Sequence, residues 1–402
     1  MTAAPHSSAG WVAIAYGALD VSASDMFADG AELLVLPADP AEPFCLTGEG
    51  ARMWRRIVAG PVTPTKDAER EMLEAMTALG IASTDSAHPA RIARLDPPRL
   101  SSPFHELAYA LTAHVAAEHG IPCVFIKGPA LHHQGLRARE HSGDVDVWCP
   151  PARWNELADA LVPWGWRRSP DPWHDTPVPH SITMTPGAWG CEIDVHRRVP
   201  GLILDDASAF DIVSAACLPV HYAGTTVPVP APDVHAVLAA VNEVRPVIGA
   251  RRRSRATASA AVGVLLATEG TRDRARELGA VPALRDEMVA AFGADAVDDT
   301  AILPRDWLWR ARPDTARAYL AALRTVPLPE RLRIFVRVLW PDDEVALASA
   351  RHAGAPTDDP ARARRQRLAR AVRGWAFRRR PGTPRASDGA ASRPQRNEGM
   401  PT

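Results

Sequence analysis

The chain has 402 residues, of which 46% are hydrophobic and 23% are charged. This composition excludes wholesale disorder and fibrous repeats, and a chain of this length is expected to form two or three domains. The formal net charge of -1 indicates no polyanionic partner for the chain as a whole.

The N-terminus and the cysteines bear on where the protein works. Residues 1–10 contain neither a basic segment nor a long apolar run, so we find no signal peptide there. The five cysteines are scattered and form no Cys-x-x-Cys pair, which argues against a zinc ribbon and a secreted disulfide framework. No apolar stretch approaches the ~18 residues of a membrane helix. We therefore expect a cytoplasmic protein without a membrane partner.

Residues 11–85 have the pattern of a small module. Apolar segments at 11–19, 31–36 and 42–46 predict strands, and helical patterns follow at 49–58 and 66–79. In the second helix Met72, Met76 and Leu79 fall at i, i+4 and i+7, which predicts that they face inward. Ile81 can begin a closing strand, and this order is that of a winged helix.

A linker and an α/β unit come next. Residues 84–103 are rich in proline and scattered charges, as is typical of a linker. Beyond it, helical patterns at 104–119 and 153–161 alternate with apolar strands, which are listed here: 123–126, 145–148 and 192–195. From 233 to 350 the periodicity is helical, in five segments: 234–244, 254–268, 283–292, 314–323 and 332–339.

The C-terminal tail is basic. Residues 361–402 hold twelve arginines against Asp388 and Glu398, so the rest of the chain is acidic. Its richness in Pro, Gly and Ser predicts disorder, apart from one short helix at 362–377. Trp375 and Phe377 are too few aromatic residues to stack nucleic-acid bases, so we expect a solvated tail and no nucleic-acid partner.

The segment from Gly143 to Trp148 carries the strongest chemical signal. Side chains alternate along a strand, so Asp144 and Asp146 lie on one face, about 7 Å apart along the chain. Such carboxylates repel each other unless a cation lies between them. Mg²⁺ or Mn²⁺ takes oxygen ligands, and Mg²⁺ keeps waters for a phosphate-bearing substrate. The alternative is a pair of solvated acids at a strand edge.

A second alternating strand, 191–196, adds a third acid. If it lies beside the first strand, Asp194 joins Asp144 and Asp146, and three carboxylates suit two-metal phosphoryl or nucleotidyl transfer. Asp194 then binds the metal on the nucleophile side or acts as general base. His196 on the same face, and His180 before a short strand that can open at 181–183, either line the pocket or are ordinary polar residues at strand ends.

Lys127-Gly128 ends the strand at 123–126. Only Lys66 and Lys127 are lysines among the 46 basic residues, and this favours a role for Lys127, although chance would give the same placement. The chain has no GxxxxGK[ST], GxGxxG, GxSxG or HExxH motif. P-loop, Rossmann, α/β-hydrolase and zincin sites are therefore excluded.

In order and spacing, Lys127-Gly128, the Asp144–Asp146 strand and Asp194-Val195-His196 resemble the uncharacterised nucleotidyltransferases related to the polymerase-beta superfamily. The resemblance covers residues 100–350 and implies a nucleotidyltransferase core, an NTP substrate and Mg²⁺ or Mn²⁺ as cofactor. It implies these catalytic metal ligands: Asp144, Asp146 and Asp194. It places these residues at the nucleotide: Lys127, Gly128, Ser142 and Gly143.

Two positions depart from the family pattern. Lys127-Gly128 replaces the superfamily's Gly-Ser pair, and Glu140 replaces an arginine four residues before the first aspartate. A lysine neutralises phosphate as a point charge, which is a different device from backbone N–H groups and a hydroxyl. The departures leave open an inactive scaffold, and the Asp-x-Asp pair leaves open a glycosyltransferase acting on a nucleotide sugar.

The segment 46–54, followed by Leu79-Gly80-Ile81, resembles the PqqD-like winged-helix domain. Domains of that family bind leader peptides of ribosomally made, modified peptides by adding a strand to a sheet edge. The resemblance implies a precursor or leader peptide as partner, and the alternative is a structural lid.

The sequence thus predicts an α+β protein in four parts. These are a winged-helix-like module at 1–90, a nucleotidyltransferase core at 100–230, a helical domain at 231–355 and a basic, largely disordered tail at 356–402. The expected reaction is Mg²⁺-dependent transfer of a nucleoside monophosphate from an NTP to a hydroxyl or phosphate acceptor, in the tailoring of a peptide natural product.

Overall fold

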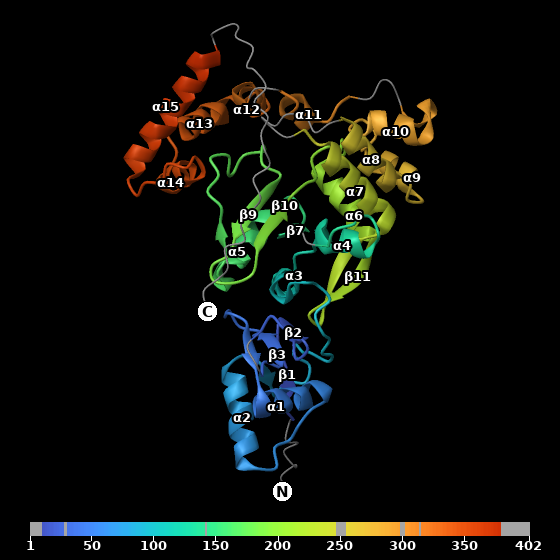
Figure 1. Ribbon diagram of the computed structural model, residues 1–402, viewed down its shortest axis with the longest axis vertical. Coiled ribbons are helices and arrows are strands. Elements are labelled where there is room, and N and C mark those ends of the chain that lie inside the picture. Colours follow the sequence, from blue (N-terminus) through green and yellow to red (C-terminus); the bar gives the residue numbers. More distant parts are fainter. Residues whose placement is uncertain are drawn as a thin grey trace, which may run out of the picture. The chain divides into compact units, whose positions relative to one another are not determined.

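The computed structural model describes residues 10–27, 30–140, 143–246, 255–297, 302–312 and 315–378. The chain divides into two compact units, residues 1–331 and 332–402. The boundaries expected near 90 and 230 fall inside the first unit, and the four-part division stays a prediction. Small sheets, one five-stranded sheet and a helical second half confirm the α+β class (Figure 1).

The N-terminal elements follow the expected order of strands, two helices and a closing strand. They are β1 (Val12–Ala13), β2 (Gly17–Asp20), β3 (Leu33–Leu36), β4 (Phe44–Leu46), α1 (Gly48–Ala59), α2 (Asp67–Ala78) and β5 (Ala82–Ser83). Strands β2, β3 and β4 form an antiparallel sheet in that order, and β1 pairs with β5.

The two helices bury one face each against these strands. Trp54 on α1 is fully buried, and its Nε1 donates a hydrogen bond to the Ile81 carbonyl at 2.9 Å. On α2 the buried residues are Leu73 and Met76, whereas Leu79 is 53% exposed. The expected inward position of Leu79 is wrong because α2 ends at Ala78, so Leu79 leaves the helical face.

A five-stranded sheet forms the centre of the first unit. Its strand order is β6 (Val124–Ile126), β7 (Asp144–Trp148), β10 (Glu192–His196), β9 (Ser181–Thr185) and β8 (Arg167–Arg168). Strands β7 and β10 are parallel, and the other neighbours are antiparallel. The alternate residues Val145, Val147 and Val195 point to one face, where they join a core shared with α3 (Pro103–Glu118) and α5 (Trp154–Ala160).

The helical region packs near the other face of the sheet (Figure 1). Its helices are α4 (Gly128–His133), α6 (Asp206–Ala215), α7 (Pro232–Val244), α8 (Arg255–Leu266), α9 (Thr271–Glu277), α10 (Arg285–Phe292), α11 (Arg305–Arg310) and α12 (Thr315–Leu323), and the single turns are η1 (Val162–Trp164) and η2 (Ala294–Ala296). Ile126 and Trp148 of the sheet enter this core beside Val237 of α7 and Trp307 of α11.

One hairpin has no counterpart in the expectations from sequence. Strands β11 (Cys217–Tyr222) and β12 (Thr225–Pro230) pair antiparallel around a turn at Ala223-Gly224. The prolines at 219 and 228 stand opposite each other in this ladder. Proline lacks the N–H that a central strand needs, so these residues hide the strand pattern.

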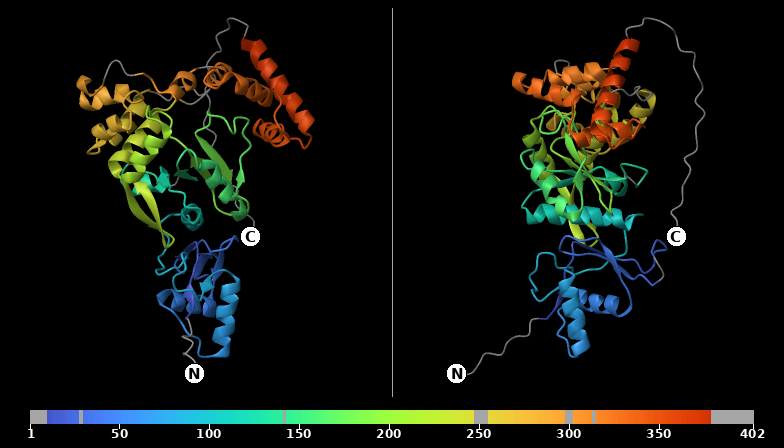
Figure 2. Two further views of the ribbon diagram at one scale, coloured as in Figure 1. Left: turned by 180° about the vertical axis from the view of Figure 1, so that it is seen from behind. Right: turned by 90° about the vertical axis from the view of Figure 1, so that its left-hand side faces the viewer.

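The N-terminal elements pack directly on α3, as both views in Figure 2 show. The ring of Tyr16 stacks on His114 of α3 with the ring centroids 4.6 Å apart, and its hydroxyl donates to Glu118 at 2.8 Å. The Ala18 N–H donates to the Ala223 carbonyl at 2.9 Å. These contacts join the N-terminal elements to the sheet-bearing part of the first unit.

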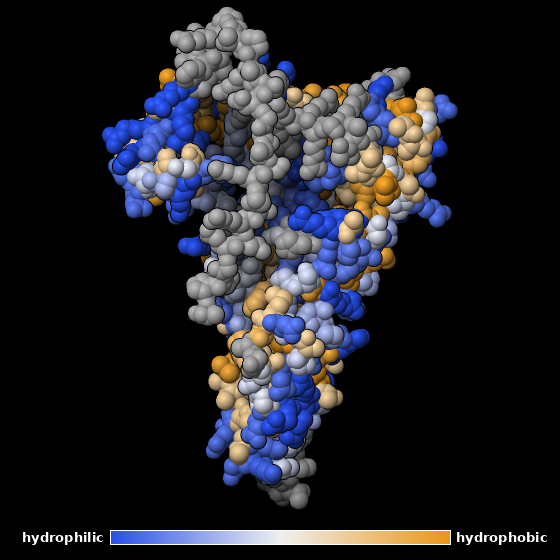
Figure 3. Space-filling model, in the orientation of Figure 1, coloured by the Kyte–Doolittle hydropathy of each residue, from blue (hydrophilic) through white to orange (hydrophobic). Residues whose placement is uncertain are grey.

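Helix α13 (Leu328–Leu339) crosses into the second unit, which also contains α14 (Asp343–His352) and α15 (Pro360–Arg378). Ala346 and Ala350 of α14 pack on Ala363 of α15, and the surface over these helices is strongly hydrophilic (Figure 3). The short helix expected at 362–377 is therefore present as α15. The stretch expected to be disordered from 380 onward lies outside the described residues. None of the helices in the described part of the chain has the length and apolar character needed to cross a membrane.

Candidate functional site

The two acidic strands lie side by side. In the parallel pairing of β7 and β10, Asp194 stands opposite Asp146, and Glu192 stands opposite Asp144. Neighbouring strands are about 4.8 Å apart, so the carboxylates at 146 and 194 share one face at close range. The structure thus meets the condition under which the sequence joined Asp144, Asp146 and Asp194 in one site.

Asp146 is the centre of this group. Its carboxylate is 3% exposed, and its Oδ1 accepts from Lys127 Nζ at 2.5 Å and lies 2.7 Å from His196 Nε2. Burial alone would raise the pKa of Asp146, but the Lys127 ammonium and the hydrogen bond with His196 outweigh it and hold the pKa at about 2. Asp146 is therefore an anion that already carries two partners.

The flanking carboxylates are held differently. Burial, together with repulsion from Asp146 and Asp194, raises the pKa of the Asp144 carboxyl to about 6. Asp194 Oδ1 accepts a hydrogen bond from Thr183 Oγ1 of β9 at 2.5 Å. The three carboxylates on this face carry more negative charge than the Lys127 ammonium can balance. A bound cation would relieve the repulsion between them.

The backbone of Lys127 has an uncommon conformation and is held by His235. Lys127 has φ +63°, a region that L-residues rarely adopt, and Gly128 and Gly143 also have positive φ. The Lys127 N–H donates to His235 Nε2 at 2.8 Å, and His235 Nδ1 lies 2.7 Å from Gln134 Oε1. Since Nε2 is an acceptor, Nδ1 carries the proton and donates to Gln134. Burial lowers the pKa of His235 to about 3, so it stays neutral and keeps this role.

His180 and His196 lie next to each other, as the pocket interpretation requires. Their ring centroids are 5.5 Å apart. His196 is 2% exposed, and its Nδ1 is buried without a hydrogen-bond partner among the described residues. Its Nε2 is engaged with Asp146, so Nδ1 is left with a buried lone pair. Of the other residues expected at the nucleotide, Ser142 lies outside the described residues.

The residues fit a divalent cation. Ligand atoms of Asp146, Asp194 and His196 all lie within 4.8 Å of one another. This set differs by one residue from the expected one, because His196 is grouped with the carboxylates and Asp144 is not. Carboxylates and imidazole suit Mn²⁺, whereas the oxygen ligands alone suit Mg²⁺. The crowded carboxylates favour a cation here.

Several site residues could not be singled out from sequence. Thr183 lay in an expected strand, but its hydrogen bond depends on β9 pairing with β10. His235 and Gln134 come from α7 and the end of α4, which the fold brings together behind Lys127. The sequence pointed to Lys127 itself, through the scarcity of lysine and the motif spacing, but not to the residues packed behind it.

Comparisons with known proteins add little to this geometry. No family profile and no curated protein matches the chain. The solution structure of the antibiotic-resistance factor ANT(2'')-Ia is 15% identical with a TM-score of 0.30, covering 46% of this chain and 93% of that one. The lincomycin-bound lincosamide antibiotic adenylyltransferase LnuA is 14% identical with a TM-score of 0.26, covering 40% of this chain and 95% of that one. Scores of this size carry no conclusion about the activity of this chain.

Proposed function

We propose that this protein is a metal-dependent nucleotidyltransferase that moves a nucleoside monophosphate from an NTP to a hydroxyl or phosphate acceptor. The observation that carries the proposal is the register of β7 and β10, which pairs Asp194 with Asp146 on the face that also bears Asp144. Three acids on two adjacent strands, one of them in contact with the Lys127 ammonium, are suited to phosphate chemistry.

In the proposed reaction the acceptor oxygen forms a bond to the α-phosphorus while the bond to the bridging oxygen breaks, and pyrophosphate leaves. A divalent cation bound by Asp146 and Asp194, with Asp144 or His196, would neutralise the charge on the phosphates. Asp194 is the base proposed to take the proton of an acceptor hydroxyl, and Thr183 fixes its orientation by hydrogen bonding. Lys127 and His196 orient Asp146 through the contacts to its Oδ1.

Labelling the α- or the γ-phosphorus of the NTP tests this reaction and distinguishes it from the alternatives. The full chain is incubated with Mg²⁺ or Mn²⁺, candidate acceptors, and each NTP labelled at the α- or the γ-phosphorus. Transfer of the α-label with release of unlabelled pyrophosphate supports the proposal. Transfer of the γ-label would show a kinase, and use of a nucleotide sugar in place of an NTP would show a glycosyltransferase. Peptide binding without any nucleotide binding would show a scaffold.

A peptide acceptor is proposed for the N-terminal elements. The outer side of β2 is covered, because Ala18 N–H donates to the Ala223 carbonyl and Asp20 N–H donates to the Asp96 carbonyl, both at 2.9 Å. At the other edge of this sheet, β4 pairs with no strand beyond β3 among the described residues. A leader peptide could therefore add as a fourth strand along Phe44–Leu46.

The peptide proposal is tested with short synthetic peptides encoded next to the gene. Binding is measured by fluorescence anisotropy with wild type and with Cys45→Pro, which alters the exposed residue of β4. Weaker binding by the variant, with unchanged NTP binding, supports the edge. Equal binding by both proteins would contradict it. Deleting residues 1–90 is a poorer test, since Tyr16 and Ala18 pack on the catalytic part.

A further inference from the structure

Two arginine side chains meet at His180, beside the carboxylate site. Arg245 follows the end of α7, and its Nη1 lies 3.0 Å from His180 Nε2. Arg310 ends α11, and its Nη2 lies 3.5 Å from His180 Nδ1. Because the His180 ring neighbours that of His196, this arginine pair adjoins the residues that hold Asp146.

Neither guanidinium has a carboxylate partner within the described part of the chain. The acid nearest in sequence to Arg310, Asp306, is already bound by both terminal nitrogens of Arg198, at 2.8 and 3.1 Å. Burial and repulsion from Arg245 lower the pKa of Arg310 to about 10, and its buried Nε has no hydrogen-bond partner. Burial also lowers the pKa of His180 well below its usual range, so this histidine is neutral and adds no third positive charge.

Both arginines are half-buried, and the carboxylates that act on them, Asp306 on both and Asp146 and Asp194 on Arg245, do so without direct contact. Partly buried cations without a directly bound counter-ion are costly for a folded chain, and removing such charges is often neutral or stabilising. Side chains that serve only the fold would not be expected to keep two of them in contact with one imidazole. Their arrangement is understandable if an anion joins them in the working protein.

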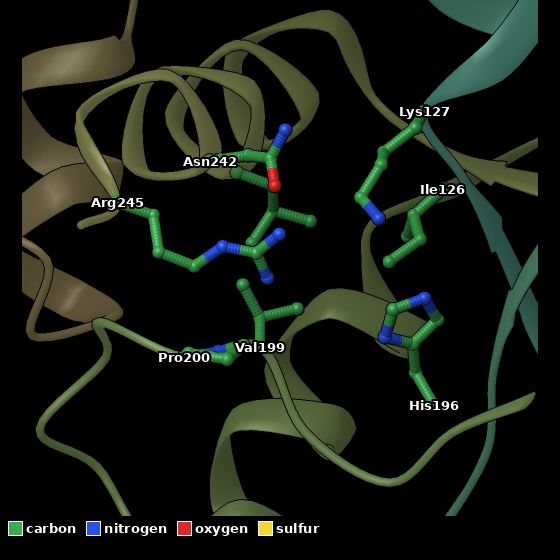
Figure 4. A pocket seen from close by; sticks show the side chains of 8 residues that line it. Ile126, Lys127, His196, Val199, Pro200, Asn242 and Arg245 are labelled. Atoms are coloured by element: carbon green, nitrogen blue, oxygen red, sulfur yellow. The ribbon is translucent and has the colours of Figure 1, made fainter. Parts of the chain in front are cut away.

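A small cavity lies between Arg245 and Lys127. It is lined by Ile126, Lys127, His196, Val199, Pro200, Leu238, Asn242 and Arg245. Figure 4 shows the Arg245 guanidinium and the Lys127 ammonium reaching into it from opposite sides, with the Asn242 amide close to Arg245. The cavity volume is about 10 Å³, the space of roughly one water, so a phosphate group enters only when Arg245 or the Val199–Pro200 segment moves.

We propose that Arg245 and Arg310, together with Lys127, form the binding site for the triphosphate of the nucleotide. This inference rests on the proposed function, since it names the groups that hold the substrate of that reaction. Planar guanidinium groups bind phosphate oxygens through paired N–H donors, which a lysine cannot do. The arginines would bind the phosphates in place of the Gly-Ser pair that Lys127-Gly128 replaces. Lys127 would contact both the phosphates and Asp146.

Inorganic tripolyphosphate in metal-free buffer is the probe, because it needs neither the base nor the cation site. Its affinity is measured by titration calorimetry for wild type, Arg245→Gln, Arg310→Gln and the charge-matched control Arg56→Gln, whose arginine pairs with Glu69 on the N-terminal helices. We expect each site variant to bind about 10- to 100-fold more weakly, the range for lost hydrogen bonds to a charged group, and the control to bind like wild type.

Thermal unfolding without ligand separates a binding role from a structural one. If the arginines serve an anion, both glutamine variants are at least as stable as wild type, and Arg245→Lys does not restore full affinity. Absent or unchanged tripolyphosphate binding, or glutamine variants that unfold at clearly lower temperature, would overturn the inference. If the α-label is not transferred but tripolyphosphate binding depends on the arginines, the proposed function is wrong and the polyphosphate site is supported.

Discussion

The carboxylate side and the arginine side of the candidate site are built in different ways. Asp146 and Asp194 belong to two paired strands, and their carboxylates carry hydrogen bonds from Lys127, His196 and Thr183. Arg245 and Arg310 stand at the ends of two helices and meet at a neutral histidine, with the Arg310 guanidinium also over the Trp309 ring at 4.7 Å. The carboxylate side is therefore assembled before any ligand arrives, whereas the arginine side is completed by an anion.

The largest expected effect comes from breaking the carboxylate side at its centre. Asp146→Asn keeps the size of the side chain but removes the charge that Lys127 and His196 hold. We expect nucleotidyl transfer to fall by about 10³-fold, as when a preorganised electrostatic contact is lost. The control Asp159→Asn removes an exposed carboxylate paired with Arg168 in the same compact unit. Activity of Asp146→Asn within tenfold of the control would contradict the assignment.

A smaller effect is expected when only the orientation of Asp194 is disturbed. Thr183→Val removes the hydroxyl that donates to Asp194 Oδ1 while keeping the shape of the side chain. The loss of a hydrogen bond to a charged group should slow transfer by about 10-fold or more. Thr185→Val on the same strand removes a hydroxyl bonded to the Arg167 carbonyl and should leave the rate unchanged. Equal rates for the two variants would show that Thr183 does not position Asp194.

The acids of the site could be grouped from the sequence, whereas Thr183 could not be assigned to the site. Alternation along a strand sufficed to put Asp144 with Asp146 and Asp194 with His196, because strand periodicity is local. Thr183 could be identified only once β9 was known to pair with β10, which depends on contacts between distant segments.

The two arginines of the site were harder to predict from the sequence than Thr183. Arg245 and Arg310 are separated by 65 positions in a chain in which 44 of 46 basic residues are arginines, so nothing in the composition singles them out. Their meeting at His180 follows from the packing of α7 and α11, which the helical pattern alone cannot fix. The β11–β12 hairpin was missed for a different reason, since its prolines mask the strand pattern.

The pH dependence of stability tests the link between Lys127 and α7. His235 must stay neutral to accept the Lys127 N–H, and burial lowers its folded-state pKa to about 3, below the unfolded value of about 6.5. The unfolded chain therefore binds the proton first, and stability is lost as pH falls below about 6.5. His235→Gln keeps an acceptor without a titrating group. Between pH 4 and 6 the free energy of unfolding from urea denaturation should fall less steeply in the variant, by about 1.4 kcal/mol per pH unit at most.

Other histidines titrate in the same range, and they set the background for this measurement. Burial lowers the pKa of His114, which stacks on Tyr16, to about 4. The slope that remains in His235→Gln should decrease again when His114→Gln is added. An unchanged slope in His235→Gln would show that His235 titrates normally and does not hold the backbone of Lys127.

The smallest expected effect concerns the strained backbone between the two sides of the site. Lys127→Ala and Lys127→Gly both remove the ammonium, but only alanine keeps a Cβ at φ +63°. Relief of that strain should make the glycine variant more stable than the alanine variant by about 1 kcal/mol in urea denaturation. A glycine variant less stable than the alanine variant would show that the conformation at Lys127 costs the fold nothing.

In the proposed function, the carboxylates bind a nucleotide together with a cation. Electron paramagnetic resonance of free Mn²⁺ during titration with the protein and a non-hydrolysable NTP analogue tests it directly, in wild type and in Asp194→Asn. We expect the analogue to tighten Mn²⁺ binding to wild type, and Asp194→Asn to lose at least about tenfold of that affinity. Equal Mn²⁺ binding by both proteins, with or without the analogue, would contradict it.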